Sequence, residues 1–495
     1  MNPQIRRLFF VFAFLFFALV GMSTYWLWRA PDLEARQGNP NLIVRQLTIK
    51  RGFVYAADGR TVLAGRRKRT LADGRVWYLR RYPEGKFTAH AVGYSTVERA
   101  RTGLEEGLND FLTGSNANLD TILDNTLDKL QGLTQEGNDV VTTLRLPAQR
   151  VAVQELADEC GAAVALDPQT GKVLVMASSP AYDPNLVESN FKRASAAAGA
   201  PCQPAAPLLN RTTQGLFIPG STFKVVTAAA ALDAGRVQPT TTFVDRGFCI
   251  EYGKRVFNFA DQSGPEVFGT VTFAEALEHS INAVFCEVGK RVGPNLILDY
   301  AERFGFYDEP PIELPSDEVQ RSGLYDGGRL FRPDDPNQVD PGRLAFGQER
   351  LLVTPLQMAL VAAAVGNDGV IMQPSLVDRI VSADGDVVDR FEPEEWKRPI
   401  EEQTAADLAA MMQSVVESGT ATGAQIPGIS VAGKTGTAET GRAGENDTWF
   451  IAFAPVERPR VAVAVALQNQ DSTGGATAAP IAKAIMEALL RGKTS

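Results

Sequence analysis

Residues 210–235 read NRTTQGLFIPGSTFKVVTAAAALDAG and contain the tetrad Ser221-Thr222-Phe223-Lys224 directly after Pro219-Gly220. The alanine-, valine- and leucine-rich run that follows favours a helix, and Gly235 is well placed to end it. Residues three apart on a helix share a face, so we expect the Ser221 hydroxyl and the Lys224 amine to be neighbours. A lysine buried among apolar residues loses its proton easily, so Lys224 can act as the base that activates the serine.

The same spacing occurs a second time, at Ser189-Asn190-Phe191-Lys192. A Ser-x-x-Lys tetrad is short enough to arise by chance about once or twice in a chain of this composition. The second copy is followed, up to Pro207, by small residues and prolines that predict a surface loop without a sustained helix. We therefore expect the nucleophile at Ser221 and not at Ser189.

Composition and charge limit the other functions open to the chain. The 495 residues, 44% hydrophobic and 22% charged, are typical of a globular protein with about two to four domains. A net charge of −9 without an extended basic tract argues against a general nucleic-acid binder. His90 and His279 are too few and too scattered for a histidine-based metal site. The cysteines lack CxxC spacing, and disulfides in any of three full pairings or unpaired thiols stay open for Cys160, Cys202, Cys249 and Cys286.

The N-terminus predicts a membrane anchor. Leu8 to Trp28 carries no charge, and this length is enough to cross the hydrocarbon core of a bilayer. Arg6 and Arg7 precede it, so the positive-inside rule places the N-terminus in the cytoplasm and the rest of the chain outside. A cleaved signal peptide is the alternative, but its apolar part is usually shorter and followed by a small-x-small site. We favour a retained single-pass anchor over residues 1–29.

Residues 30–145 differ in character from the rest, being polar and rich in arginine and glycine. Residues 49–64 predict a β-hairpin that turns at Asp58-Gly59, and Leu104–Leu112 predicts a short helix. No nucleophile with a plausible base stands out in this segment. It is therefore expected to be a spacer or docking module.

From Leu146 onward, helix-like and strand-like segments alternate. Residues 161–177 predict a buried hairpin, and three strand candidates in a row near the C-terminus predict antiparallel pairing. Helices at both ends of the segment can cover such a sheet, so residues 146–495 predict an α/β domain with one antiparallel sheet flanked by helices. The expected helices are Gln149–Glu159, Ser221–Ala234, Phe273–Val292, Pro355–Val365 and Ala478–Leu490, and the expected late strands are Ile429–Ala438, Trp449–Ala454 and Val461–Leu467.

A second candidate motif is His279-Ser280-Ile281-Asn282. The Ser280 hydroxyl can relay a proton to an attacking or leaving amine, and the Asn282 carboxamide can hold both a substrate amide and the lysine. Alone, such a pair is most often a helix cap.

A third candidate motif is Lys434-Thr435-Gly436-Thr437, which lies on a predicted strand. Gly436 has no side chain, so a substrate backbone can approach the strand edge closely. Thr435 and Thr437 can then bind a carboxylate, with Lys434 supplying positive charge. Alone, this tetrad is typical of an exposed edge strand.

Ser-x-x-Lys, Ser-x-Asn and Lys-Thr-Gly in this order are the signature of penicillin-binding proteins and serine β-lactamases. The chain resembles the class B, monofunctional penicillin-binding proteins, in particular the penicillin-binding protein A group, over nearly everything after the apolar segment. Ile281 stands where β-lactamases commonly carry Asp, and this departure suits a penicillin-binding protein. Other similar boxes are Arg51-Gly52, Asp58-Gly59-Arg60, Leu63-Ala64, Tyr82-Pro83, His90–Tyr94, Gly103-Leu104-Glu105, Phe346-Gly347-Gln348, Thr354–Ala359 and Gly433–Glu439.

The resemblance implies a penicillin-binding protein transpeptidase fold behind a β-rich pedestal, and a D,D-transpeptidase that cross-links peptidoglycan. It implies that Ser221 attacks the carbonyl between two terminal D-alanines of a stem peptide, with Lys224 as general base. Ser280 and Lys434 would pass the proton to the departing D-alanine. The backbone N–H groups of Ser221 and Thr437 would form the oxyanion hole, and β-lactams would acylate the same serine. No metal or organic cofactor is implied.

Three other functions stay open from the motifs. A D,D-carboxypeptidase or β-lactamase-like hydrolase would use water in place of the amine, a penicillin sensor would need a cytoplasmic output, and a wall-synthesis scaffold would lack the chemistry. The transpeptidase is favoured because only residues 1–7 are expected inside the cell and all three motifs are intact. No glycosyltransferase module is evident in the chain, so a multispanning glycan polymerase of the SEDS type is the expected partner of the anchor and residues 29–130.

Overall fold

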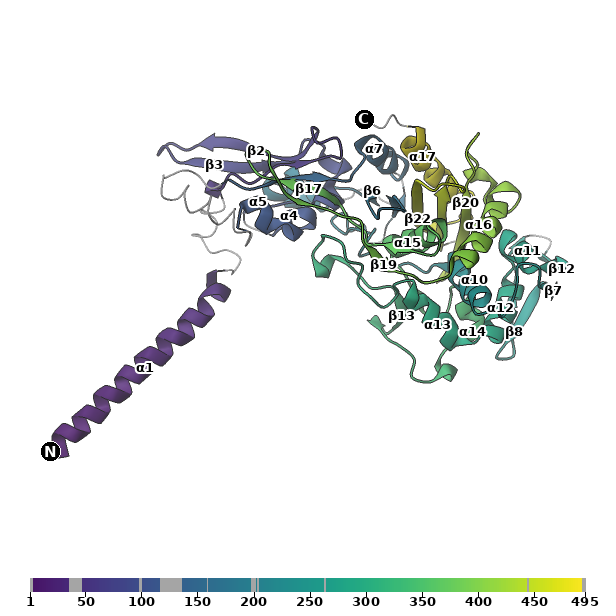
Figure 1. The fold of residues 1–495 in the computed structure, drawn as a ribbon, viewed down its shortest axis with the longest axis horizontal. Helices are drawn as coiled ribbons and strands as arrows, with labels where there is room; N and C mark the ends of the chain where they lie inside the picture. Colours follow the sequence, from purple (N-terminus) through teal and green to yellow (C-terminus); the bar gives the residue numbers. More distant parts are fainter. Residues whose placement is uncertain are drawn as a thin grey trace.

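The computed structural model describes residues 3–34, 47–97, 100–115, 136–157, 159–196, 202, 204–261, 264–442 and 445–491. Helix α1 (Pro3–Glu34) is followed by a β-rich unit and then by a larger α/β unit (Figure 1). Within the described part of the chain, Gln4–Trp26 in α1 is the one helical stretch long and apolar enough to cross a membrane. This agrees with the apolar segment predicted over Leu8–Trp28.

The α/β unit is built on a five-stranded sheet in the order β20-β21-β22-β5-β6, with every neighbouring pair antiparallel. The predicted antiparallel sheet is therefore confirmed. The hairpin β5–β6, which comes first in the chain, joins the far side of the three C-terminal strands. Every residue of β5 is buried because both faces of the sheet are covered. The strands are β5 (Cys160–Leu166), β6 (Val173–Ser179), β20 (Ala432–Arg442), β21 (Glu445–Ala454) and β22 (Val461–Gln470).

Helices pack on the sheet in two groups, α7 with α17 and α15 with α16 (Figure 1). Helix α15 is apolar all round and buried, as expected for a helix with neighbours on every side. It begins where the Thr354 hydroxyl accepts a hydrogen bond from the Gln357 N–H at 3.2 Å. The helices are α7 (Leu146–Glu155), α10 (Lys224–Asp233), α15 (Pro355–Gly366), α16 (Glu402–Glu417) and α17 (Ala478–Arg491).

One predicted helix is wrong in its extent. The sequence predicts a single helix over Phe273–Val292, whereas the structure has α11 (Phe273–Glu278) and α12 (Asn282–Val292). The break falls at Ser280, whose φ of +57° lies in the left-handed region and cannot continue a right-handed helix.

The β-rich unit contains a six-stranded sheet in the order β18-β17-β4-β1-β2-β3. Its predicted first hairpin is confirmed, since β1 and β2 pair antiparallel. Two strands, β17 and β18, come from far later in the chain and complete this sheet, a pairing that no local pattern predicts. The elements are β1 (Val54–Tyr55), β2 (Val62–Thr70), β3 (Val76–Arg81), β4 (Asp139–Thr142), β17 (Val377–Val381), β18 (Val387–Arg390), and the short helices α4 (Gly103–Gly107) and α5 (Asn109–Thr113).

The second Ser-x-x-Lys tetrad is split between two short helices rather than lying in a loop. Ser189 ends α8 (Asn185–Ser189), and Lys192 lies in α9 (Phe191–Ala194). The Ser189 hydroxyl donates to the Asn185 carbonyl at 3.3 Å, and both residues of the tetrad that carry chemistry are exposed. Among the described residues between Lys192 and Pro207, no helix extends beyond Ala194, as expected.

The cysteines form two disulfides, Cys160–Cys202 and Cys249–Cys286. The structure thus selects one of the three pairings that the sequence leaves open.

Candidate active site

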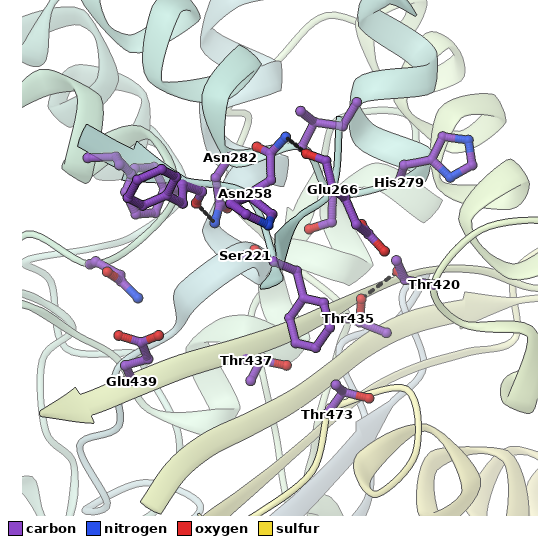
Figure 2. A pocket seen from close by; sticks show the side chains of 18 of the residues that line it. Ser221, Asn258, Glu266, His279, Asn282, Thr420, Thr435, Thr437, Glu439 and Thr473 are labelled. Carbon is purple, nitrogen blue, oxygen red and sulfur yellow. Dashed lines mark hydrogen bonds between the residues drawn. The ribbon is translucent and has the colours of Figure 1, made fainter. Parts of the chain in front are cut away.

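The three sequence motifs meet in one cleft of about 780 Å³. Figure 2 shows Ser221, Asn282, Thr435 and Thr437 around this space, with β20 forming one wall. Ser221 lies on a 3-10 turn (η2, Gly220–Phe223) that leads directly into α10, Ser280 and Asn282 lie at the α11–α12 break, and the threonines lie on β20.

Two lysines lie beneath the cleft and share the Ser280 hydroxyl. The Lys224 amine donates to the Asn282 Oδ1 at 2.8 Å, to the Ser280 carbonyl at 2.7 Å and to the Ser280 Oγ at 3.2 Å. The Lys434 amine donates to the same Oγ at 2.9 Å and to the Thr435 carbonyl at 3.1 Å. Both lysine side chains are fully buried, so the Ser280 hydroxyl connects two amines that are shielded from water.

Burial changes the protonation of both amines. Removal from water lowers the pKa of Lys434 to about 7. Burial lowers the pKa of Lys224 well below its usual value, and the neighbouring Lys434 charge lowers it further. A neutral amine at Lys224 can accept a proton, as a general base must.

The backbone at Ser280 is held in a conformation that a serine rarely adopts. A non-glycine residue at positive φ costs on the order of 1–3 kcal/mol and is found mainly where the surrounding structure requires it. At Ser280 this conformation turns both the carbonyl and the hydroxyl toward Lys224. Two residues later, Asn282 begins α12, and its Nδ2 donates to the Phe257 carbonyl at 3.1 Å.

The turn that carries Ser221 is held from both sides. The Ile218 N–H donates to the Asp447 carboxylate at 3.0 Å, and the Ile218 carbonyl accepts from the Trp449 indole at 2.9 Å. Asp447 is buried on β21, and burial raises the pKa of its carboxyl to about 6. These bonds fix the peptide three residues before the nucleophile, and no sequence motif marks Asp447.

On the other side of the turn, Gly347 packs against Gly220. A Cβ at Gly347 would lie 2.2 Å from the Gly220 carbonyl oxygen, and the φ of Gly347 is +78°. Only glycine fits this position. The Gly220 N–H also donates to the Gly347 carbonyl at 3.1 Å.

A glycine at position 436 has a packing role that the sequence did not predict. The sequence suggested that Gly436 lets a substrate approach the strand. In the structure, a Cβ at Gly436 would lie 2.8 Å from the Pro219 carbonyl oxygen and 3.0 Å from Thr222 Cγ2. The glycine therefore allows the serine-bearing turn to pack on β20, and it is not among the residues that line the cleft.

Strand β20 is an end strand of its sheet, and two of its threonines, Thr435 and Thr437, line the cleft. The Thr435 and Thr420 hydroxyls share a hydrogen bond of 2.6 Å (Figure 2), and the Gly474 N–H donates to Thr437 Oγ1 at 3.3 Å. Thr420 belongs to no motif and was not found from the sequence. It sets the direction of the Thr435 hydroxyl.

The wall opposite β20 comes from the segment between β7 (Thr242–Asp245) and β12 (Gly269–Thr272). Asn258 joins this segment to α12: its Nδ2 donates to the buried Asp245 carboxylate at 3.0 Å, and its Oδ1 accepts from the Ala283 N–H at 2.9 Å. His279 also lines the cleft, stacked on Phe268 with 5.0 Å between ring centroids. No sequence pattern predicted this wall.

The described side chains thus combine a half-buried serine hydroxyl, two buried amines of lowered pKa and a hydroxyl that links them. This combination is suited to nucleophilic acyl transfer. Cys249, Glu251 and Cys286 also lie close together, but the two sulfurs are joined in a disulfide and are not free to bind a metal.

Comparison with known families matches two regions. The penicillin binding protein transpeptidase domain family matches residues 161–487, and the penicillin binding protein A dimerisation domain family matches residues 51–140.

Comparison with individual proteins extends over the full chain. The chain is 35% identical to the peptidoglycan D,D-transpeptidase PbpA of Mycolicibacterium smegmatis over 99% of both chains. It is 33% identical to PbpA of Mycobacterium tuberculosis over 100% of both.

Among solved structures, the ceftriaxone acyl-enzyme complex of penicillin-binding protein A from M. tuberculosis superposes with a TM-score of 0.79 at 32% identity, covering 90% of this chain and 100% of that one. The D,D-transpeptidase domain of a peptidoglycan glycosyltransferase from Eggerthella lenta superposes with a TM-score of 0.75 at 33% identity, covering 89% and 99%.

Proposed function

The chain belongs to the penicillin-binding proteins, as a class B member similar to penicillin-binding protein A, and we infer that it is a peptidoglycan D,D-transpeptidase that β-lactams acylate. The main support for the mechanism is that two buried lysines both donate hydrogen bonds to the Ser280 hydroxyl, next to the cleft that Ser221 lines.

In the proposed acylation step, Ser221 Oγ attacks the carbonyl carbon between the two terminal D-alanines of a stem peptide. The Oγ proton passes to the neutral Lys224 amine, whose lowered pKa favours this role. The peptide C–N bond then breaks, and the leaving nitrogen receives a proton through the Ser280 hydroxyl from the lysines. The products are a Ser221 acyl ester and free D-alanine.

The substrate's terminal carboxylate is proposed to bind along β20. Thr435 and Thr437 offer hydroxyl donors into the cleft, and the Lys434 charge lies beneath them. Gly436 serves this site by seating the strand against the serine-bearing turn. The backbone N–H groups of Ser221 and Thr437 are proposed as the oxyanion hole, where a single donor is worth about 3–4 kcal/mol in other serine enzymes.

The acyl ester is resolved by an amine of a second stem peptide. The Lys224 amine, or the Ser280 hydroxyl between the two lysines, accepts the proton of the attacking amine as the new peptide bond forms. The ester bond to Ser221 then breaks, and the same proton is returned to Ser221 Oγ, which restores the serine hydroxyl. Water in place of the amine would make the protein a D,D-carboxypeptidase or a β-lactamase-like hydrolase.

Product analysis separates these outcomes. The full-length protein in detergent is incubated with a stem peptide ending in D-Ala-D-Ala and an excess of a D-amino acid as acceptor. Mass spectrometry should show exchange of the terminal D-alanine for the acceptor, and the exchange should disappear in Ser221→Ala but not in Ser189→Ala. A product shortened by one D-alanine without exchange would assign the hydrolase.

The anchor, the pedestal and the partner are also proposals. Residues 1–29 would hold the protein in the cell membrane with the N-terminus in the cytoplasm, residues 30–145 would form the pedestal, and residues 146–495 would carry the catalytic domain outside the cytoplasm. The single apolar helix in α1 supports this arrangement.

We further propose that α1 and residues 29–130 bind a multispanning glycan polymerase of the SEDS type, although 35–46 and 116–130 lie outside the described residues. Co-purification of such a polymerase from membranes should be lost when both segments are replaced. Co-purification that survives the replacement would contradict the proposal.

A further inference from the structure

The hairpin formed by β2 and β3 is strongly basic in a chain whose net charge is −9. Residues 62–81 contain one acidic side chain, Asp73. The basic side chains are Arg66, Arg67, Lys68, Arg69, Arg75, Arg80 and Arg81. Figure 1 shows the hairpin as two long strands that extend beyond the rest of the N-terminal sheet.

The charges at the base of the hairpin are neutralised by the protein. Arg66 forms an ion pair with Glu136, and Arg80 pairs with the buried Glu105. At the turn, Arg75 pairs with Asp73 at 2.7 Å. These cations therefore have structural partners.

Four other cations of the hairpin have no such acidic partner among the described residues. Arg67, Lys68, Arg69 and Arg81 are exposed, and among the residues that the structure describes none of them has an acidic partner within ion-pair distance. The hairpin thus presents a concentrated positive charge that nothing in the described chain offsets.

The strand register places three of these cations beside apolar side chains. Arg67 pairs with Leu79 and Arg69 with Trp77, while Arg81 lies on the same face as Leu79 because side chains alternate along a strand. Trp77 and Leu79 are half-buried, so part of each is accessible. A face that combines arginines with an indole and a leucine is the composition found at membrane–water interfaces.

A second copy of the chain is a poor occupant for this surface. Among the described residues, β3 is the end strand of its sheet, and an end strand can pair edge to edge with another chain. Such pairing would bring two hairpins of the same strong positive charge together, and like charges opposite one another on strands are destabilising. The surface therefore fits an anionic partner better than another copy.

An anionic surface lies within reach of the hairpin. The chain re-enters the described structure at Leu47, and residues 35–46 can span at most about 40 Å from the end of α1. The Arg66 guanidinium donates to the Lys50 and Arg51 carbonyls at 3.1 and 3.2 Å, so the base of the hairpin lies where the chain arrives from the anchor. Tethering raises the local concentration of head groups around the hairpin.

We propose that the outer part of the β2–β3 hairpin binds anionic phospholipid head groups of the membrane that holds α1, through Arg67, Lys68, Arg69 and Arg81. This contact would hold the pedestal against the membrane surface and restrict the height and tilt of the catalytic cleft above it. The inference uses the proposed anchor but not the transpeptidase chemistry.

The test measures how close the hairpin lies to the lipid head groups, in full-length protein reconstituted in nanodiscs. The four described cysteines are in disulfides, so Ala72→Cys, in the exposed hairpin turn, supplies a single thiol for a fluorophore without reductant. Energy transfer to an acceptor on the lipid head groups is compared between discs of phosphatidylcholine alone and discs that also contain phosphatidylglycerol. We expect higher transfer in the anionic discs, decreasing as salt is raised.

Charge reversal gives the matched comparison. The variant R67E/K68E/R69E/R81E should show no difference between the two lipids, because each cation near an anionic surface contributes about fivefold to binding. The control K192E/R193E/R458E/R460E reverses four exposed cations elsewhere and should behave as the unmodified protein. A thermal unfolding transition like that of the unmodified protein verifies folding in each variant, and R67Q/R69Q replaces the fourfold variant if that one does not fold.

Equal transfer in neutral and anionic discs would overturn the proposal, as would an anionic-lipid effect that survives charge reversal. Energy transfer between two labelled chains in one disc, without dependence on lipid charge, would assign the hairpin to a contact between copies instead. Failure of Ser221 to be acylated would contradict the proposed enzyme function but leave this result unaffected.

Discussion

Replacement of Lys434 by methionine should move the pH dependence of acylation toward higher pH. The Lys224 and Lys434 amines contact the same Ser280 hydroxyl at 3.2 and 2.9 Å, so they lie no more than about 6 Å apart. Two unit charges at this separation repel by about 3 kcal/mol at an effective dielectric constant of about 20. The Lys434 charge is therefore one reason why Lys224 is neutral and can act as the base.

The direction of the pH shift follows from which protonation state of Lys224 is active, namely the neutral amine. The pKa of Lys434 is lowered to about 7, so this lysine is charged below that pH. There its positive charge disfavours protonation of Lys224. Lys434→Met removes this repulsion, so the pKa of Lys224 rises and the neutral base form appears only at higher pH. On the acid side of the profile, 3 kcal/mol corresponds to a decrease of up to about a hundredfold in acylation rate, in addition to any loss at the plateau.

The assay is the second-order rate of acylation by a fluorescent penicillin, measured from about pH 5 to pH 9 on full-length protein in detergent. Lys434→Arg is the matched control, because an arginine keeps its charge throughout this range and should not move the midpoint to higher pH. A midpoint for Lys434→Met that is unchanged or lower would refute the coupling between the two lysines.

Substitutions at three further positions test the geometry around the nucleophile. Asp447→Ala leaves a backbone N–H before the serine without its acceptor, so the maximal acylation rate should decrease by about tenfold, whereas Asp447→Asn should restore most of it because the carboxamide oxygen can accept the same bond. Thr420→Val removes the hydroxyl that bonds Thr435 and should weaken substrate binding by about 2- to 12-fold with the maximal rate little changed. Gly347→Ala would place a methyl group 2.2 Å from the Gly220 carbonyl oxygen at a φ of +78°, and should lower the unfolding free energy by about 2 kcal/mol or more, seen as a decrease in Tm.

The elements with a local pattern were predictable from the sequence. The helix after Ser221, the buried strands and the three late strands follow from apolar periodicity, and the structure contains all of them. The family follows from three short motifs in order, none of which is informative alone. Because the serine-bearing turn η2 packs on β20 and leads into α10, these motifs come together only in the folded chain.

The parts that were missed depend on contacts between distant residues. The break at Ser280 interrupts a segment with good helical periodicity, and the positive φ there accompanies contacts with two lysines that are distant in the sequence. The packing role of Gly436 depends on a turn more than two hundred residues earlier in the chain. Thr420 has no motif, and its role is visible only once its loop is placed against β20.

The most direct test of the central claim is to identify the residue that captures a β-lactam. The full-length protein is incubated with a labelled penicillin and digested, and the modified peptide is mapped by mass spectrometry at several times after the free drug is removed. We predict a single adduct on Ser221 that persists after removal of the drug. An adduct on Ser189 or any other residue, or rapid release of hydrolysed penicillin without a persistent adduct, would contradict the account.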